Sequence, residues 1–360
     1  MRRWPFVLTA TDLRSVFTEA VDSRIALEHL PQTAVYRDAI HRLARELECE
    51  PTEEAVLEVR NRDEPAAYAN RLMDQSGNGL LLLDHGFSPQ AFTPDDHRSA
   101  IHLPQREVIR LETLAERLIG ACAEPREWFG KVRQALRDSL AAGAVAVKTI
   151  AAYRAGLRLR PGDPEEVGVA FSLLRTKVDR AEAIRLTGAP LCHSLLLEAA
   201  EECAKLGVPL QVHCGFGDPD EDLAEASPLG LRLLFQDPRF RDLRTVLLHC
   251  YPFHREAAYL CSVYPGVYMD LSLALPMAGV DGLKAVHEAL GLCPWSKLLY
   301  ATDATRLPEA YFVAAAVHRE ALSEGFAELV EHGILIRREA VEAGLLVLAG
   351  NAARVYALND

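Results

Sequence analysis

Apolar and polar positions follow two different patterns along this chain. From Thr9 to about Ala67, apolar residues recur at helical spacing among many charged ones, most clearly in segments 12–22 and 39–47. Thr52, which precedes two glutamates and an apolar run, resembles the start of a helix. We therefore predict that residues 1–70 form a helical insertion or cap.

After residue 70, short apolar runs alternate with amphipathic helical sequence, which is typical of βα units and a parallel sheet. The predicted strands are Gly79–Leu83, Glu107–Leu111, Ala144–Ile150, Pro209–His213, Thr245–His249, Val267–Leu271 and Lys297–Thr302. The predicted helices include Arg126–Leu140, Ser194–Leu206, Pro228–Phe235, Arg255–Val263, Val280–Leu290, Pro308–His332 and Arg338–Leu358.

This series of strands, each followed by helical sequence, predicts an α/β fold: a (β/α)8 TIM-like barrel whose first strand is missing. Residues 71–360 would form the barrel, and segment 1–70 would belong to the same structural domain. The alternative is a doubly wound open sheet. We rank it second because no G-x-G-x-x-G motif follows any predicted strand.

Ionisable residues interrupt the apolar runs close to the strand ends. His213 and His249 end two successive predicted strands, Asp303 follows a third, and Lys148 lies within a fourth. The carboxyl ends of barrel strands converge on one rim. Imidazole and carboxylate are ligands that zinc accepts at roughly 2.0–2.2 Å. A bound ion would make a nucleophile of its water, and a carboxylate such as Asp303 could carry the water's proton.

Each of these residues also has a structural interpretation. A single strand-end histidine usually serves as a hydrogen-bonded structural residue, Asp303 could cap the next helix, and Lys148 could form a salt bridge at the rim. The joint pattern of His, His and Asp at successive strand ends favours a metal site.

Several segments carry a resemblance to a known family. They are Lys148–Arg154, His213–Asp220, Leu248–Pro252, Thr302–Asp303, Arg255–Leu260, Val267–Ser272 and Arg110–Leu114. In these segments the chain resembles the amidohydrolase superfamily of metal-dependent TIM-barrel hydrolases. It looks closest to the branch found fused to glutamine-synthetase-like domains in fungal developmental regulators and plant nodulin-like proteins.

The resemblance implies a role for each matching residue. His213 and His249 would take the ligand positions of strands five and six, with His249 also in the catalytic centre. Asp303 would take the strand-eight position that binds metal and handles the proton. Lys148 would lie on strand four, where some branches carry a carboxylated lysine that bridges two metals. The expected cofactor is a divalent metal, preferably zinc.

One family feature is absent. Members of the family begin with a strand that ends in His-x-His, and no His-x-His occurs among the 360 residues. Three explanations are open: the true start codon lies upstream of Met1, the chain is a paralogue that binds metal weakly or not at all, or other histidines replace the missing pair. The candidates for replacement are His85, His97 and His102.

Composition narrows the choice of partner and compartment. The net charge of −12 argues against nucleic acid and anionic membranes, which need a basic face. The eight cysteines contain no C-x-x-C pair, and the N-terminus lacks the apolar core of a secretory signal, so we expect reduced thiols in the cytoplasm. The expected partner is a small-molecule substrate, and self-association into a homo-oligomer stays open.

We therefore predict a hydrolase of C–N, amide-like bonds in a small carboxylated substrate. Arg154 could clamp the substrate carboxylate and Tyr251 could donate a hydrogen bond to it; a surface arginine and a packed tyrosine are the alternatives. Two other functions are open: a metal-dependent decarboxylase on the same barrel, and a metal-poor, non-catalytic barrel that acts as a binding or scaffold protein.

Overall fold

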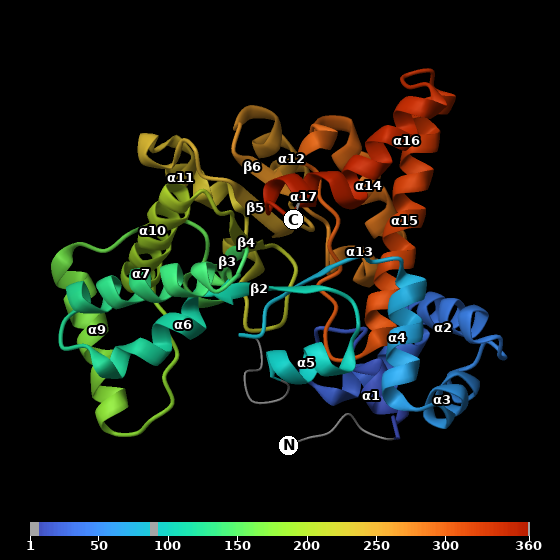
Figure 1. Cartoon of the computed structure of the whole chain (residues 1–360), viewed down its shortest axis with the longest axis horizontal. Helices are drawn as coiled ribbons and strands as arrows, with labels where there is room; N and C mark the ends of the chain where they lie inside the picture. The colour runs from blue at the N-terminus through green and yellow to red at the C-terminus, as the bar shows by residue number, and fades with distance from the viewer. Residues whose placement is uncertain (1–6, 87–92, 359–360) are drawn as a thin grey trace.

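A parallel sheet forms the centre of the molecule (Figure 1). The computed structural model describes residues 7–86 and 93–358. Within them the sheet has six strands in sequential order: β1 (Leu81–Leu83), β2 (Gln105–Arg110), β3 (Ala146–Thr149), β4 (Leu210–Cys214), β5 (Thr245–His249) and β6 (Val267–Met269). Because each strand pairs with the next one along the chain, the sheet has the order of a half-barrel, and the doubly wound alternative is wrong.

The predicted strand Lys297–Thr302 is not formed as a strand. Its pairing with β6 is limited to a single bridge between Met269 and Leu298 and a hydrogen bond of 2.8 Å from the Leu299 N–H to the Met269 carbonyl. Beyond that point the chain leaves the sheet, and the Tyr300 hydroxyl donates to Oδ1 of Asn78. The segment still runs alongside β6 and brings Asp303 to the same edge as the strand ends.

The strand Thr245–His249 agrees with the prediction at both ends, and the boundaries of the other strands differ from it by at most two residues. The largest consequence concerns β2, which ends at Arg110, so that Leu111 and Glu112 open the next helix. An acidic residue in a first helical turn is favoured by the helix dipole. The apolar run Val108–Leu111 therefore contains a strand end and a helix start.

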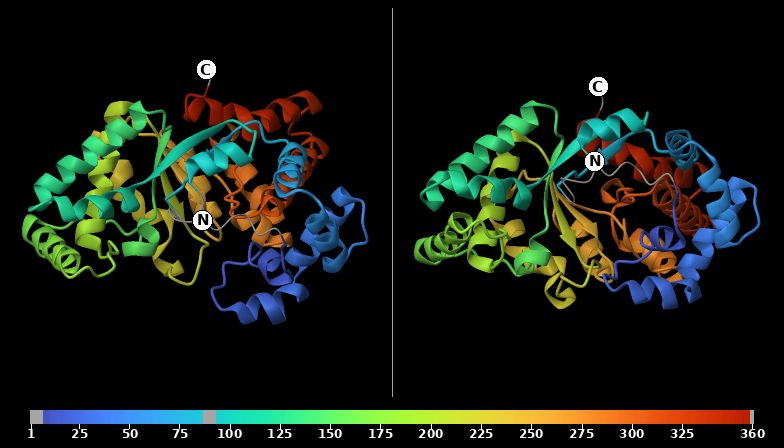
Figure 2. Two further views of the ribbon diagram at one scale, coloured as in Figure 1. Left: turned by 60° about the horizontal axis from the view of Figure 1, so that its bottom comes forward. Right: turned by 90° about the horizontal axis from the view of Figure 1, so that it is seen from below.

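The helices cover the sheet on its outside and at its edges. Their bounds are α1 (Ala10–Arg14), α2 (Ala34–Leu47), α3 (Glu53–Arg62), α4 (Pro65–Ser76), α5 (Pro94–Ala100), α6 (Leu111–Leu118), α7 (Pro125–Ala141), α8 (Ala151–Ala155), α9 (Pro164–Asp179), α10 (Ala189–Leu206), α11 (Arg232–Gln236), α12 (His254–Val263), α13 (Ala274–Met277), α14 (Val280–Leu292), α15 (Pro308–Glu331), α16 (Arg337–Leu345) and α17 (Asn351–Val355). Figure 2 shows α6, α7, α9 and α10, in green, on the opposite side of the sheet from the orange and red C-terminal helices.

The described residues of the N-terminal segment form several helices, the last of which ends at Ser76. Helices α1 to α4 lie beside α15, the blue and orange-red elements of Figures 1 and 2. Leu43 of α2 and Leu72 of α4 are buried in the same apolar cluster as Val147 of β3 and Leu247 of β5. The N-terminal helices and the sheet thus share one hydrophobic core.

Two further features concern the cysteines and the apolar content of the helices. All eight cysteines are free thiols, and seven of them are buried, as expected for core-packed cysteines. Within residues 7–86 and 93–358, no helix has the length and apolar content that crossing a lipid bilayer requires.

Candidate active site

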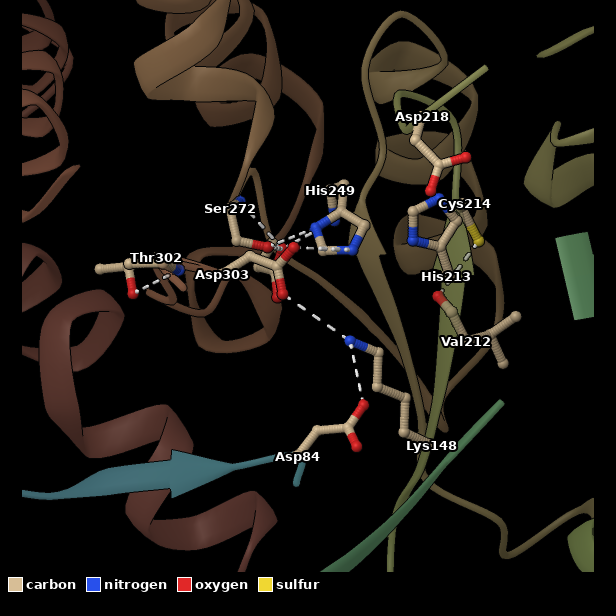
Figure 3. A network of polar contacts seen from close by, with 12 residues as sticks. Asp84, Lys148, Val212, His213, Cys214, Asp218, His249, Ser272, Thr302 and Asp303 are labelled. Carbon is tan, nitrogen blue, oxygen red and sulfur yellow. Dashed lines mark hydrogen bonds and ion pairs between the residues drawn. The ribbon is translucent and has the colours of Figure 1, made fainter. Parts of the chain in front are cut away.

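The structure brings His213 and His249 together at the carboxyl ends of neighbouring strands. Cys214 of β4 pairs with His249 of β5, so the two histidines leave the sheet one residue apart in register. Both side chains are buried, and their ring centroids are 4.5 Å apart. Residues far apart in sequence therefore place two imidazoles side by side, as Figure 3 shows.

Asp303 approaches this pair from the segment that follows β6. Its Oδ2 lies 3.8 Å from Nε2 of His249, and its side chain is 30% exposed. The backbone is left-handed at both residues, with φ of +67° at His249 and +51° at Asp303. Such conformations are costly for residues other than glycine and concentrate at functional sites.

Lys148 lies between two carboxylates on the other side of Asp303. Its Nζ is 3.7 Å from Oδ1 of Asp303 and 3.7 Å from Oδ2 of Asp84, the residue that follows β1 (Figure 3). Arg110 also pairs with Asp84, at 2.6 Å. The ammonium group thus occupies a position where it balances two negative charges.

A hydrogen-bond relay fixes the tautomer of His249. Nδ1 of His249 lies 2.7 Å from the Ser272 hydroxyl, and that hydroxyl donates its proton to Oδ1 of Asp270 at 2.6 Å. With its single proton committed to Asp270, the hydroxyl accepts from His249, so the imidazole proton resides on Nδ1. The lone pair of Nε2 is then directed toward Asp303, and this buried atom has no hydrogen-bond partner among the described residues.

Both imidazoles are neutral. Burial, reinforced by the nearby Lys148 ammonium, lowers the pKa of His213 to about 3. Burial, together with His213 and Lys148, lowers the pKa of His249 well below its usual range. A neutral imidazole with a free lone pair is the form that binds a metal.

Imidazole and carboxylate groups are suitable ligands for a divalent ion. The spacing of His249 and Asp303 also suits one. Two ligands about 2 Å from a tetrahedral ion are roughly 3.3 Å apart, which is close to the 3.8 Å between His249 and Asp303. Nε2 of His213, however, contacts Oε2 of Glu221 at 3.2 Å. Within the described part of the chain, no group of three or more His, Cys, Asp or Glu side chains is arranged to hold a metal. His213 would have to exchange its contact with Glu221 for the ion, or share the ion with it.

Two acidic residues at this site were not predicted from the sequence. Glu221 follows β4 in a rim loop, where burial and the neighbouring Asp218 raise its pKa to about 8. Glu19 comes from the N-terminal segment, where burial, Asp303 and Asp218 raise its pKa to about 7 against the opposing effect of Arg306. The segment interpreted as a cap therefore contributes a residue to the site.

The other candidate residues contact groups outside this centre. Arg154 pairs with Glu116 of α6 at 3.6 Å, and the Tyr251 ring stacks on His254 with centroids 5.9 Å apart. Substrate binding by Arg154 and Tyr251 stays a prediction. Of the alternative ligands, His97 contacts Gln105 and His102 contacts Asp74, while His85 packs edge-on against His97.

Comparison with known proteins gives a consistent result. The family model described as Amidohydrolase matches residues 74–358. Protein fluG of Emericella nidulans is 28% identical over 366 residues, a match that covers 93% of this chain and 42% of that protein. The chain thus spans less than half the length of this curated relative.

Solved structures share the fold. A proposed metal-dependent hydrolase from Lactobacillus casei ATCC 334 has a TM-score of 0.86 and 30% identity, covering 97% of this chain and 90% of that one. Uronate isomerase from Thermotoga maritima has a TM-score of 0.66 at 13% identity, covering 96% of this chain and 82% of that one. Glucuronate isomerase from Caulobacter crescentus has a TM-score of 0.59 at 16% identity, with 82% and 68% covered. At these identities, the two isomerases show likeness of fold alone.

Proposed function

Because the chain belongs to the amidohydrolase superfamily, we propose that it is a metal-dependent hydrolase that cleaves a C–N bond in a small molecule. One observation carries the proposal: the buried lone pair of His249, fixed by Ser272, is directed at Asp303 beside the imidazole of His213. The similar chain from Lactobacillus casei, described as a proposed metal-dependent hydrolase, supports the same reaction class.

His213, His249 and Asp303 would hold the divalent ion, for which zinc is our proposal because imidazole and carboxylate are ligands it accepts. When bound, such an ion supplies a nucleophilic water at neutral pH and polarises the carbonyl that is attacked. His213 and His249 contribute uncharged donors, so they add no positive charge that would repel the ion. Ser272 and Asp270 hold the His249 ring in place.

Asp303 is the residue that we propose moves the proton. Its carboxylate is partly exposed and lies next to His249, so it can accept a proton from the attacking water and return it to the departing amine. Lys148 orients this carboxylate through its contact with Oδ1. The ammonium of Lys148 lies between Asp84 and Asp303, where a carboxylated lysine would place a third negative charge. We therefore propose that Lys148 acts here as an unmodified cation rather than as a bridging ligand.

The test combines metal analysis with a substitution. The purified full chain is assayed for bound metal by mass spectrometry and for amine release from a panel of small amides. Asp303→Asn should lower the rate of amine release by about 10²–10⁴-fold, the usual contribution of a general acid–base group. Asp281→Asn, an exposed position on α14 that pairs with Lys284, serves as the control and should keep full activity.

Three outcomes would contradict this function. Amine release that survives Asp303→Asn would remove Asp303 from the reaction. Release of carbon dioxide without amine would indicate the decarboxylase. The absence of both bound metal and turnover in chelator-free preparations would favour the non-catalytic barrel.

A further inference from the structure

A cavity of about 370 Å³ lies beside the candidate active site. One wall is the N-terminal segment Thr18–Ala20, and the other is the loop of residues 216–223 that follows β4. Glu221 connects this cavity to the active site, because its second carboxylate oxygen contacts His213. The volume lies within the range of small-molecule sites, roughly 300–1,000 Å³.

Among the described residues, the wall of the cavity carries three acidic side chains. Glu19 reaches it from the N-terminal segment, and Asp218 and Glu221 reach it from the loop. No Lys, Arg or His is among the described residues that line it. Arg306 faces Glu19 from outside this lining and offsets part of its charge, while Asp303 adds to it.

One oxygen of Glu221 has no hydrogen-bond donor within the described part of the chain. Its side chain is only 2% exposed, and Oε1 has no hydrogen-bond partner among the described residues. A buried carboxyl oxygen without a hydrogen-bond partner is unfavourable, and a bound ligand that donates to it would relieve the cost. The feature is therefore more than a group of surface acids.

The geometry favours an organic cation over a metal ion. Zinc is usually held by imidazole or thiolate as well as carboxylate, and the described residues that line this cavity include no histidine or cysteine. An ammonium group instead donates up to three hydrogen bonds to oxygens about 2.7–2.9 Å from its nitrogen, a wider shell than a metal ion requires. Phe216 and Leu223 add apolar surface to the same wall, which suits the hydrocarbon part of an amine.

We propose that this cavity binds the ammonium group of the substrate, so that the chain acts on small compounds with a primary amine near the bond to be cleaved. This inference rests on the proposed function, which specifies the bond that is cleaved. It adds the class of substrate, a small compound with a primary amine. It differs from the sequence-based expectation, in which a carboxylate on the substrate met Arg154.

The test measures binding and needs no turnover. The full chain, as purified, is titrated in a calorimeter with n-pentylammonium chloride, sodium pentanoate or pentanamide, which share a chain length and differ in charge. Only the ammonium compound should bind. Glu19→Gln and Asp218→Asn should each weaken its binding about tenfold, the loss expected for one hydrogen bond to a charged group.

Asp220→Asn provides a matched control in the same loop. Asp220 is exposed, pairs with Arg185 at 2.9 Å and does not line the cavity. Its substitution should leave the affinity for pentylammonium unchanged. Because Glu19 and Asp218 come from separate segments, failure of one variant to fold still leaves the other to decide.

The inference is overturned if pentanoate or pentanamide binds as tightly as pentylammonium, or if both cavity variants bind it as the wild type does. It is also overturned if the wild type does not bind pentylammonium and the Glu19→Gln and Asp218→Asn variants lose zinc binding, because these acids would then serve a metal ion. Hydrolysis is a separate readout: ammonium binding without any amide turnover would retain the cation site and reject the proposed reaction.

Discussion

The proposed role of His249 depends on its hydrogen bond with the uncharged side chain of Ser272. The Ser272 hydroxyl accepts a hydrogen bond from Nδ1 of His249 and donates one to Asp270. The lone pair of Nε2 is therefore directed toward Asp303. Without that hydroxyl, either nitrogen could carry the proton and the ring could rotate. Partners of this kind typically change metal affinity 10–100-fold.

Ser272→Ala is therefore expected to weaken metal binding by about 10–100-fold. The measurement is competition for zinc against a chromophoric chelator. Ser262→Ala, an exposed position on α12 whose hydroxyl donates to the Tyr259 carbonyl, should bind zinc like the wild type. Equal affinities in the two variants would remove the relay from the account of the site.

The surroundings of Glu112 favour the protonated, uncharged form of its side chain. It is fully buried on α6, where Oε1 accepts from the Thr149 hydroxyl at 2.5 Å and from the Ile150 N–H at 3.1 Å, while Oε2 has no partner among the described residues. Burial raises the pKa of Glu112 in spite of these hydrogen bonds. The native protein therefore keeps a proton that the unfolded chain loses at about pH 4.5.

This raised pKa predicts the direction of a pH effect. As pH rises above 4.5, the native state holds the extra proton, so the free energy of unfolding falls by up to about 1.4 kcal/mol per pH unit until Glu112 ionises in the folded state. Glu112→Gln keeps the acceptor oxygen and does not titrate. Its stability relative to wild type should therefore increase as pH rises through this window, in urea unfolding measured at a series of pH values. Parallel curves for the two proteins would show that the carboxyl titrates normally.

At the scale of elements, strand order and helix positions could be predicted where apolar patterns were long and separated by turns. Thr245–His249 was predicted to the residue, because a buried strand reads as one apolar run. Lys297–Thr302 also contains a short apolar run, yet it pairs through a single bridge. Composition shows that a segment is buried and extended, but the register with its neighbour depends on tertiary contacts such as that of Tyr300 with Asn78.

A buried ion pair joins helices α3 and α15, a contact that no sequence pattern predicts. Nε of Arg60 on α3 lies 3.5 Å from Oε1 of Glu309 on α15, and both side chains are at most 1% exposed. The Arg60 guanidinium also lies 5.4 Å from the centre of the Tyr68 ring. Glu309 is in the first turn of α15, shortly after Asp303, so this contact ties the N-terminal helices to the segment that carries the proposed catalytic carboxylate.

Removing one member of this pair leaves a buried charge without its partner. Arg60→Met and Glu309→Met should each lower the free energy of unfolding by about 3–5 kcal/mol, whereas the double variant should recover most of that loss because both charges are gone. Urea unfolding of the four proteins measures the coupling between the two positions. If the two losses simply add, the pair does not act as a unit.

At the scale of the whole molecule, the candidate site combines residues that the sequence could and could not reveal. His213, His249 and Asp303 could be found because polar residues at the ends of apolar strands are conspicuous. Glu19 could not, since it lies in a segment predicted as helical, where acidic residues are frequent. Only the packing of that segment beside the strand ends brings it near Asp303. Glu221 was overlooked because its loop has no periodic pattern to mark which acid faces inward.

A metal held by this site would connect β4, β5 and the segment before α15. Any ligand that binds the native state and not the unfolded chain stabilises the fold, by about 2.7 kcal/mol when its concentration is 100 times the dissociation constant. Chelator-treated protein should therefore unfold at a lower temperature than untreated protein, and added zinc should raise the midpoint in proportion to the logarithm of its concentration. Calorimetry of the full chain across a zinc series measures this effect.

The same series distinguishes the site from non-specific binding. Asp303→Asn and His249→Gln remove proposed ligands and should lose most of the zinc-dependent rise in unfolding temperature. His332→Gln removes an exposed histidine just after α15 and should keep the full rise. If His332→Gln lost the rise as completely as His249→Gln, the stabilising zinc would be bound at the surface, and β4 and β5 would be joined only by their sheet hydrogen bonds.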